Sequence, residues 1–416
     1  MGTLVLMGSG ETAPTMMPVH RRVLAAAGSG PAVMLDTTFG FQTNADELVE
    51  KTRTYFRDSV GRDVSVASWR RQDAPTLEKE RALAALSSAA WVFAGPGSPS
   101  YALRQWAGTP VTSALESVVR RGGTVCLGSA AAVLAGAFAI PVYEIYKAGA
   151  DPYWLDGLGL VGDLCGLNAV VIPHFDNKEG GHYDTRFCYL GEQRLETLEA
   201  LLPDGYGVLG IDEHTAIIID TQARTVEVAG NGTLTLRIRG ESHRYTSGTV
   251  LPLDDVAALL SGSSTEILSR EQVQSTSHEM TPTNERPVTL RVLTDTAGEG
   301  FDGAVADRNV DHAVAAVLDL EENIHEWSND MQVGDDDYAR RQLRAMIVRL
   351  GAVAEVGARD PREVVAPYVE ALLEIRTAAR AAKDFATSDL VRDRLAAIGV
   401  EVRDTPEGQT WHLASS

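Results

Sequence analysis

The strongest constraint on the fold is an alternation that runs from the N-terminus to about residue 220. Short apolar runs bounded by glycine alternate there with longer amphipathic stretches, a pattern typical of parallel strands joined by crossover helices. Such a sheet is covered by helices on both faces and binds ligands beyond the carboxyl ends of its strands. We predict strands at residues 3–7, 32–35, 63–68, 90–94, 124–127, 169–172 and 215–219, and helices at 45–57, 76–86, 111–120 and 194–202.

The length of 416 residues exceeds what one hydrophobic core usually covers, so we expect more than one domain. Residues 225–252 alternate in polarity around an Asn-Gly pair and predict an antiparallel hairpin at the edge of the first domain. The next stretch is rich in Ser, Thr, Glu and Gln, and the chain then shows helical spacing of apolar residues. We therefore predict an α/β domain at 1–260, a linker at 261–295 and a helical domain at 296–416.

The formal net charge of −20 disfavours bulk binding to nucleic acid or anionic lipid, although a local basic patch could still contact a phosphate. The three cysteines are too scattered for a disulfide framework or a metal site, which fits a reducing cytoplasm. The apolar runs are broken by charges or glycines, so no membrane span is expected. We predict a cytoplasmic protein without cofactor or metal, and leave open whether it forms a homodimer.

Ser129 stands where a predicted strand breaks into a helix, in the stretch Gly-Gly-Thr-Val-Cys-Leu-Gly-Ser-Ala-Ala-Ala at 122–132. Such a turn presents a hydroxyl above the sheet beside backbone N–H groups, as a nucleophile beside an anion-stabilising site requires. A serine here can equally cap the helix. The segment can be aligned with such a turn in two ways. If the alignment starts from Gly122 and Gly123, Ser129 occupies the position of the nucleophile; if it starts from Gly128, Ala130 occupies that position and the site is predicted to be inactive.

Two further loops favour a catalytic role for Ser129 over a helix-capping role. His174 directly follows a predicted strand, at a position where a general base is needed. It is the first residue of a polar loop, and such a concentration of polar residues after a core strand suggests a substrate-binding surface. Within that loop we predict substrate contacts from Asn177, Glu179 and Arg186. The glycine turn at 93–97 follows another strand, and the N–H groups of Gly97 and Ala130 are the predicted oxyanion hole.

With these motifs, residues 3–250 resemble the cyanophycinase and peptidase E group of serine peptidases, whose fold is class I glutamine amidotransferase-like. The matching segments are the glycine-rich first strand, the turn at 93–97, the elbow at 122–132, the His-Phe pair at 174–175 and Gly-Ile-Asp-Glu-His-Thr-Ala at 210–216. The resemblance implies a three-layer, mostly parallel sheet. It also implies a nucleophile at Ser129, a base at His174 and an orienting acid at Glu144, with Glu213 or Asp176 as alternatives.

Residues 373–411 resemble the C-terminal end of cysteinyl-tRNA synthetases, through Arg-x3-Arg-x2-Lys-Asp-Phe-Ala and Asp-Thr-Pro-x-Gly-x-x-Trp. In the synthetase this region supports tRNA binding, but the signatures of the synthetase catalytic core do not occur in this chain. We predict helices and a terminal hairpin with a core of Phe385, Leu390, Leu395 and Ile398. The basic residues of this segment either touch phosphate or pair with nearby aspartates, namely Arg376, Arg380, Lys383, Arg392 and Arg394.

Together these readings predict a serine hydrolase acting on a peptide or isopeptide bond of a small peptide or amino-acid-derived substrate. Family substrates tend to be acidic, and Arg104, Lys147, Lys178 and Arg186 are the cations that would receive a carboxylate. Two alternatives stay open. One is an inactive accessory protein that binds tRNA or a protein, and the other is a hydrolase of an aminoacyl ester such as aminoacyl-tRNA.

Overall fold

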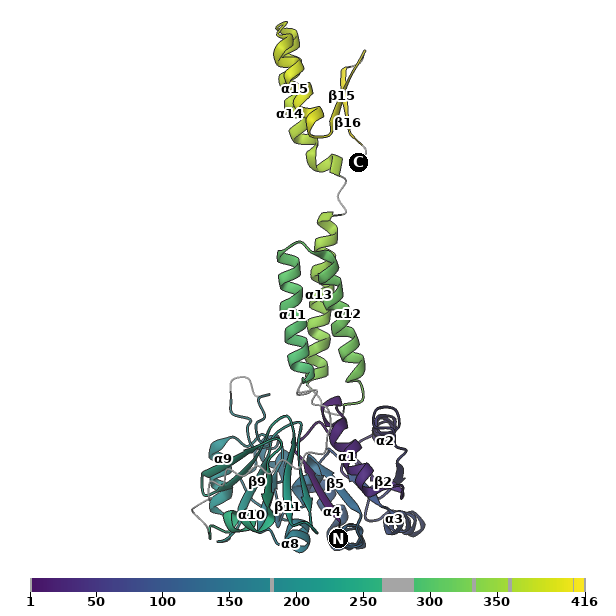
Figure 1. Ribbon diagram of the computed structural model, residues 1–416, viewed down its shortest axis with the longest axis vertical. Helices are drawn as coiled ribbons and strands as arrows, with labels where there is room; N and C mark the ends of the chain where they lie inside the picture. Colours follow the sequence, from purple (N-terminus) through teal and green to yellow (C-terminus); the bar gives the residue numbers. More distant parts are fainter. Residues whose placement is uncertain are drawn as a thin grey trace. The chain divides into compact units, whose positions relative to one another are not determined.

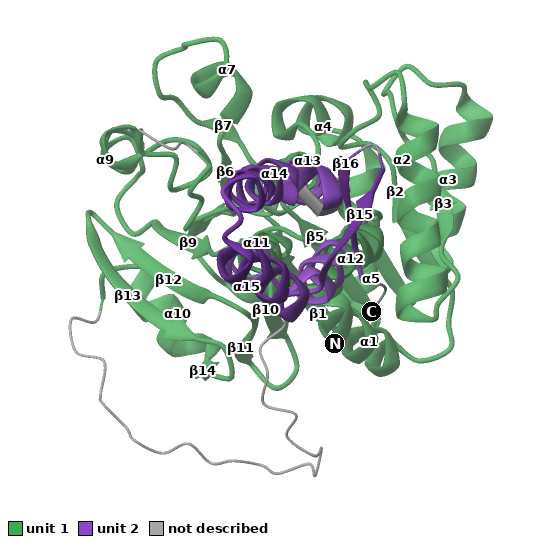
Figure 2. Ribbon diagram, turned by 90° about the horizontal axis from the view of Figure 1, so that it is seen from above, with its two compact units in different colours: residues 1–297, 318–341 green, residues 298–317, 342–416 purple. Residues whose placement is uncertain are grey.

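A computed structural model describes residues 2–179, 183–263, 288–330, 334–357, 361–406 and 408–414. Two compact units are distinguished, one formed by residues 1–297 with 318–341 and the other by 298–317 with 342–416 (Figure 2). Most of the predicted linker, residues 264–287, lies outside the described residues. Among the described residues, every helix is too short or too polar to cross a membrane.

The main sheet of the first unit has eight strands in the order β14-β11-β10-β1-β5-β4-β2-β3. Of these, β2, β5 and β11 are labelled in Figure 1. Neighbours from β1 to β3 are parallel, as predicted, whereas β10 pairs antiparallel with β1. The mostly parallel sheet is therefore confirmed with an antiparallel wing. Its strands are β1 (Thr3–Met7), β2 (Ala32–Leu35), β3 (Ser65–Ala67), β4 (Trp91–Ala94), β5 (Thr124–Gly128), β10 (Thr215–Asp220), β11 (Thr225–Gly230) and β14 (Val250–Pro252).

Helices cover both faces of the parallel part, which makes three layers. Alternate residues of β1 separate into two cores: Val5 and Met7 pack with α1 and α2, and Leu4 and Leu6 pack with α3, α4 and α5. This alternation buries both faces of the strand, as the continuous apolar runs predicted. The helices are α1 (Met17–Ala27), α2 (Ala45–Thr54), α3 (Thr76–Ser88), α4 (Pro99–Trp106), α5 (Pro110–Arg120), α6 (Ala130–Leu134), α7 (Val142–Tyr146), α8 (Leu160–Cys165), α9 (Glu192–Ala200) and α10 (Leu253–Leu260). A 3-10 turn, η1 (Pro14–Met16), precedes α1, and a π-helical segment, η2 (Tyr55–Val60), continues α2.

A second sheet, in the order β13-β12-β9-β8, contains an antiparallel hairpin within 225–252, formed by β12 and β13. Its turn is at residues 239–240 and not at the Asn-Gly pair around which the hairpin was predicted. β11 and β12 flank the Asn-Gly pair, but they belong to different sheets. The residues of the pair bond to the loop at 212–215 instead of closing a hairpin: Asn231 N–H donates to the His214 carbonyl and Gly232 N–H to Thr215 Oγ1. The strands are β8 (Ala169–Ile172), β9 (Gly207–Ile211), β12 (Thr233–Ile238) and β13 (Glu241–Thr246), and a small separate pair is β6 (Phe138–Ala139) with β7 (Leu155–Asp156).

The C-terminal region is helical and ends in a hairpin, as predicted. It contains α11 (Leu290–Ala306), α12 (Val310–Glu326), α13 (Asp335–Gly357), α14 (Pro361–Ala381), α15 (Phe385–Ala397), β15 (Val400–Thr405) and β16 (Gly408–Leu413). The predicted core of its last part is largely wrong, because Phe385, Leu390 and Ile398 are exposed. Leu395 is buried, and it packs with Val369, Leu373, Val400 and Trp411.

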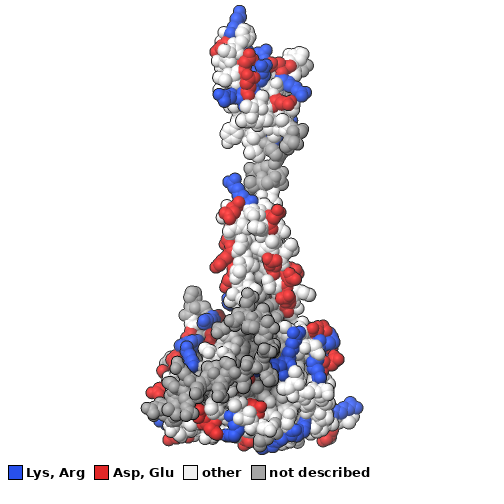
Figure 3. All heavy atoms as spheres, viewed as in Figure 1, with Lys and Arg blue, Asp and Glu red and all other residues white. Residues whose placement is uncertain are grey.

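The predicted basic face of this region is mostly paired with acids. Arg376 is buried and donates two hydrogen bonds to Asp404, which also pairs with Arg380. Arg392 lies beside Asp389 and Asp393, the pairing that the sequence offered as the alternative to phosphate binding. In the view of Figure 3, Lys and Arg side chains of this region lie interspersed with Asp and Glu.

Candidate active site

Ser129 occupies a sharp turn between β5 and α6. Its φ of 46° and ψ of −113° are unusual for a residue with a side chain, a strain that persists only where the surroundings hold the backbone. The Ser129 N–H donates to the carbonyl of Met7 at 3.0 Å, which anchors the turn to β1. The Ser129 hydroxyl makes no capping hydrogen bond to α6. Helix capping therefore does not explain this serine.

The hydroxyl instead meets an imidazole. Oγ of Ser129 lies 2.8 Å from Nε2 of His174, and both side chains are nearly buried. His174 follows β8 at a φ of 48°, and its own N–H donates to the carbonyl of Gly8. The contact is within the range for a nucleophile and its general base. Two residues that are 45 positions apart in the chain are thus brought together.

The acid at this histidine is Glu213 and not Glu144. Oε1 of Glu213, in the loop between β9 and β10, lies 2.8 Å from Nδ1 of His174. Glu144 lies on α7, where its Oε1 accepts a hydrogen bond from the Ser100 hydroxyl at 2.6 Å. Asp176, the other alternative, accepts the backbone N–H of Glu213 and so positions the loop. Glu213 ends the Gly-Ile-Asp-Glu segment at 210–213, the signal that pointed to it in the sequence.

The charges around His174 favour its protonated form. Burial disfavours the imidazolium, but the hydrogen bond and the charge of Glu213, with smaller help from Glu11 and Glu179, raise the pKa of His174 above its usual value. Burial acts against the Glu213 carboxylate too, but the hydrogen bond and charge of His174, together with the hydrogen bond from Asn177, outweigh it and lower the pKa of Glu213. This arrangement stabilises the imidazolium form of His174.

The predicted oxyanion groups lie in neighbouring turns. β4 and β5 are adjacent and parallel, with Ala94 opposite Leu127, so the turns that follow them leave the sheet at the same edge. Ala130 is the first residue of α6, where a backbone N–H has no intrahelical acceptor. Gly97 has a φ of 145°, and a Cβ there would lie 2.1 Å from the Thr38 carbonyl oxygen, so only glycine fits. Ser98 caps α4 by accepting the N–H of Tyr101.

The predicted substrate-binding residues have different surroundings. Asn177 is buried and donates from Nδ2 to Oε1 of Glu213 at 3.0 Å, so it supports the acid. Glu179 accepts the hydroxyl of Tyr189, whose ring lies 6.1 Å from that of His174. Arg186 forms a two-point ion pair with Asp184, so its guanidinium is already engaged by a carboxylate.

The possible metal ligands and the thiols of the described residues complete the account of reactive groups. They contain no group of three or more His, Cys, Asp or Glu side chains placed to bind a metal ion. The cysteines Cys126, Cys165 and Cys188 are buried and unpaired, and burial raises the pKa of the Cys188 thiol to about 12. A thiolate nucleophile is thus disfavoured at these three positions.

Comparison with known proteins confirms the C-terminal resemblance. The family described as "Cysteinyl-tRNA ligase anticodon binding domain" matches residues 364–411. The cysteine–tRNA ligase of Pseudarthrobacter chlorophenolicus is 39% identical over 125 residues, which cover 28% of this chain and 25% of that ligase. That of Nitratidesulfovibrio vulgaris is 65% identical over 45 residues, 11% of this chain and 9% of the ligase. The chain spans about a quarter or less of the length of these relatives.

The N-terminal part aligns with solved structures of peptidases. A peptidase from an acI-B1 Actinobacterium aligns over 60% of this chain and 96% of its own, with 20% identity and a TM-score of 0.49. A structure described as a peptidase E protein from Listeria monocytogenes aligns over 59% of this chain and all of its own, with 13% identity and a TM-score of 0.37. Both TM-scores are below 0.5.

Proposed function

We propose that the chain is a serine hydrolase that cleaves an acyl bond with Ser129 as nucleophile, His174 as base and Glu213 as orienting acid. The observation that carries the proposal is the continuous relay of two contacts, each 2.8 Å long, from the Ser129 hydroxyl through both nitrogens of His174 to Glu213. The strained backbone at Ser129 supports it, because such strain gathers at functional turns.

The reaction would begin when His174 takes the Ser129 proton at Nε2 as Oγ attacks a carbonyl carbon. The N–H groups of Ala130 and Gly97 would bind the oxyanion. His174 would then return the proton to the leaving nitrogen or oxygen, leaving an acyl group on Ser129. Water, activated by the same imidazole, would release the acid and restore the hydroxyl. A peptide, an isopeptide or an ester carbonyl suits this sequence of steps.

We assign a second role, contact with tRNA, to the C-terminal region on the strength of the match at residues 364–411. Salt bridges already occupy Arg376, Arg380 and Arg392, so any phosphate contact would rest on other groups, such as Lys383 and Arg394, or would exchange these pairs. A tRNA-binding hydrolase with buried, reduced cysteines belongs in the cytoplasm, which is the location we propose.

A fluorophosphonate probe tests the hydrolase directly, since it reacts with activated serines without requiring the substrate. We expect covalent labelling of the full chain, located at residue 129 by peptide mass, and its loss in Ser129→Ala. Ser388→Ala is the matched control, because Ser388 is also a buried serine but lies on α15, in the second unit. If the native chain stays unlabelled while folded, the accessory, non-catalytic alternative is favoured.

A further inference from the structure

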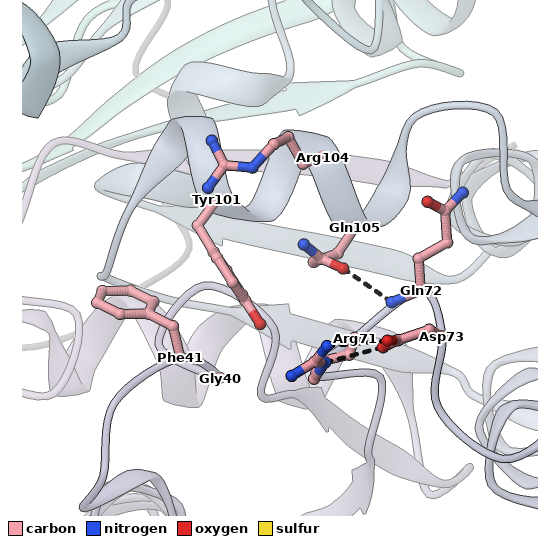
Figure 4. A pocket seen from close by; sticks show the side chains of 8 residues that line it. All are labelled: Gly40, Phe41, Arg71, Gln72, Asp73, Tyr101, Arg104 and Gln105. Carbon is pink, nitrogen blue, oxygen red and sulfur yellow. Dashed lines mark hydrogen bonds and ion pairs between the residues drawn. The ribbon is translucent and has the colours of Figure 1, made fainter.

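Two adjoining hollows lie between the loops after β2 and β3 and the helices α4 and α7. One has a volume of about 630 Å³ and is lined by residues that include Ser98, Ser100 and Tyr143. The other, about 900 Å³, shares Phe41, Tyr101 and Arg104 with it (Figure 4). We call the two hollows the α4–α7 groove. Ser98, in its lining, directly follows Gly97, the predicted oxyanion residue, in the turn beside the Ser129 elbow.

The groove presents aromatic rings to solvent. Phe41 is 51% exposed and Tyr143 is 43% exposed, although large aromatic side chains are usually buried. The rings of Phe41 and Tyr101 lie 5.0 Å apart, and the Arg104 guanidinium lies 5.8 Å from the Tyr101 ring. Exposed rings with a guanidinium beside them form a surface on which planar bases stack.

The groove also contains cations that are not engaged by acids. Arg104 and Lys147 both line it, and neither belongs to the ion pairs found among the described residues, in contrast to Arg186 with Asp184. Arg71, at the far end, is paired with Asp73 (Figure 4). In a chain of net charge −20, two unpaired cations beside exposed rings match a ligand that carries both anions and flat apolar groups.

Glu144 adds an acceptor that lacks a partner. Its Oε1 accepts from Ser100, but its Oε2 is buried with no hydrogen-bond partner. A buried carboxylate oxygen without a donor is costly, so it favours a ligand that brings one. The ammonium group of an amino acid is such a donor. Glu144 thus has a place in this site although it is not the acid of the histidine.

We propose that the α4–α7 groove binds the 3′ end of an RNA that carries an amino acid as an ester, and that this ester is the bond cleaved. The proposal rests on the hydrolase function proposed above. Phosphates would contact Arg104 and Lys147, bases would stack on Phe41, Tyr101 and Tyr143, and the α-ammonium group would meet Glu144. An acidic peptide would use the two cations, and its N-terminal ammonium group would also meet Glu144, but it would leave the exposed rings unmatched. The tRNA-ligase domain at 364–411 independently favours the RNA.

The chemical step balances without a further reactant. Ser129 Oγ bonds to the ester carbonyl carbon, the bond from that carbon to the ribose oxygen breaks, and the serine proton passes through His174 to the ribose oxygen. Water then attacks the aminoacyl-serine ester. The products are an RNA with a free 3′ hydroxyl and an amino acid, and Ser129 regains its proton.

Protection of Ser129 from the fluorophosphonate probe tests whether the groove holds the RNA. The ligand is a short RNA ending in CCA, with the amino acid attached through a stable amide. On the full chain we expect this RNA to slow labelling about tenfold or more at saturation, with a protection constant that weakens as salt rises. Arg104→Gln and Lys147→Gln should each weaken protection about tenfold and reduce the salt slope by about one. Arg120→Gln is the matched control: it removes the same charge from an exposed arginine at the end of α5, outside the groove, and should leave protection unchanged.

Three results would overturn the proposal. One is labelling at an unchanged rate under saturating RNA; another is equal effects of Arg104→Gln and Arg120→Gln. The third is protection by a tetra-aspartate peptide but not by the RNA, which would assign the groove to acidic peptides. If the probe fails to label the native chain at all, the hydrolase proposal fails. In that case, the affinity of the native chain and of Arg104→Gln for the same RNA, now carrying a fluorescent dye and measured by fluorescence anisotropy, tests RNA binding to the groove separately from the hydrolase activity.

Discussion

Oε1 of Glu213 lies 2.8 Å from Nδ1 of His174, on the side of the ring away from Ser129. The same oxygen accepts a hydrogen bond from Asn177, and the Glu213 N–H donates to Asp176. A carboxylate can only accept, so this contact fixes the proton of a neutral imidazole on Nδ1. Nε2 is then left as the acceptor for the serine hydroxyl. The loop between β9 and β10 therefore sets the tautomer that the proposed reaction needs.

Substitution of the two glutamates separates their roles. Glu213→Gln should lower the rate of fluorophosphonate labelling about 10³- to 10⁴-fold, because an amide that donates to Nδ1 selects the wrong tautomer. Glu144→Gln should lower it far less, since its carboxylate bonds to Ser100 and not to His174. Circular dichroism of both variants checks that they fold. Similar losses in the two variants would contradict the assignment of Glu213.

The rate of fluorophosphonate labelling should rise with pH in one sigmoidal step, set by the deprotonation of His174. Only neutral His174 accepts a proton, and its pKa is raised by Glu213, so the midpoint should lie above 6.5. In Glu213→Gln the midpoint should move to lower pH, because the charge that favours the imidazolium is gone. The raised pKa also stabilises the folded chain at low pH, a contribution that is lost as the pH rises through the folded-state value. A midpoint that stays in place in the variant would show that Glu213 does not act on His174.

Gly128 is expected to be intolerant of a side chain. A Cβ there would lie 2.4 Å from Cγ of Glu11, whose own side chain is buried. Gly128→Ala should therefore destabilise the first unit by about 1–3 kcal/mol and displace the Ser129 turn. Gly162→Ala is the matched control. Gly162 lies within α8, and a Cβ there would meet only the Leu167 carbonyl oxygen, at 3.8 Å. Thermal unfolding should show a lower midpoint for the first variant and an equal or higher one for the second.

The strands of the parallel part were predictable because both of their faces are buried. Continuous apolar runs such as residues 91–94 and 124–127 have few other structures available. The apolar pattern of a strand does not depend on whether its neighbour is parallel or antiparallel, so the antiparallel pairing of β10 with β1 was not predicted. The segment Gly-Val-Leu-Gly-Ile of β9 was missed, since two glycines in five residues weaken a strand pattern. The Asn-Gly pair was misread because its bonds to residues 214 and 215 depend on tertiary contacts.

In the site, Ser129 and His174 could be predicted, since each follows a buried strand and strand ends meet at one edge of the sheet. The choice between Glu144 and Glu213 could not be made from the sequence. Both are many residues from His174, and only the closure of the second sheet brings Glu213 to Nδ1. The pairing of Arg186 with Asp184, two residues away, is local and was open to prediction.

The terminal hairpin should depend on Arg376 far more than on a neighbouring arginine. Arg376 is almost fully buried and holds Asp404 of β15 through two hydrogen bonds of 2.8 and 2.9 Å. Arg376→Gln leaves a buried site short of these charged hydrogen bonds and should destabilise the region by about 2–4 kcal/mol. Arg392→Gln, which breaks an exposed contact of 3.4 Å to Asp389, should cost about 0.5 kcal/mol or less. Hydrogen exchange of the full chain should show faster exchange of β15 and β16 amides in the first variant only. Equal protection in both would mean that the hydrophobic contacts of Leu395 and Trp411 alone hold the hairpin on its helices.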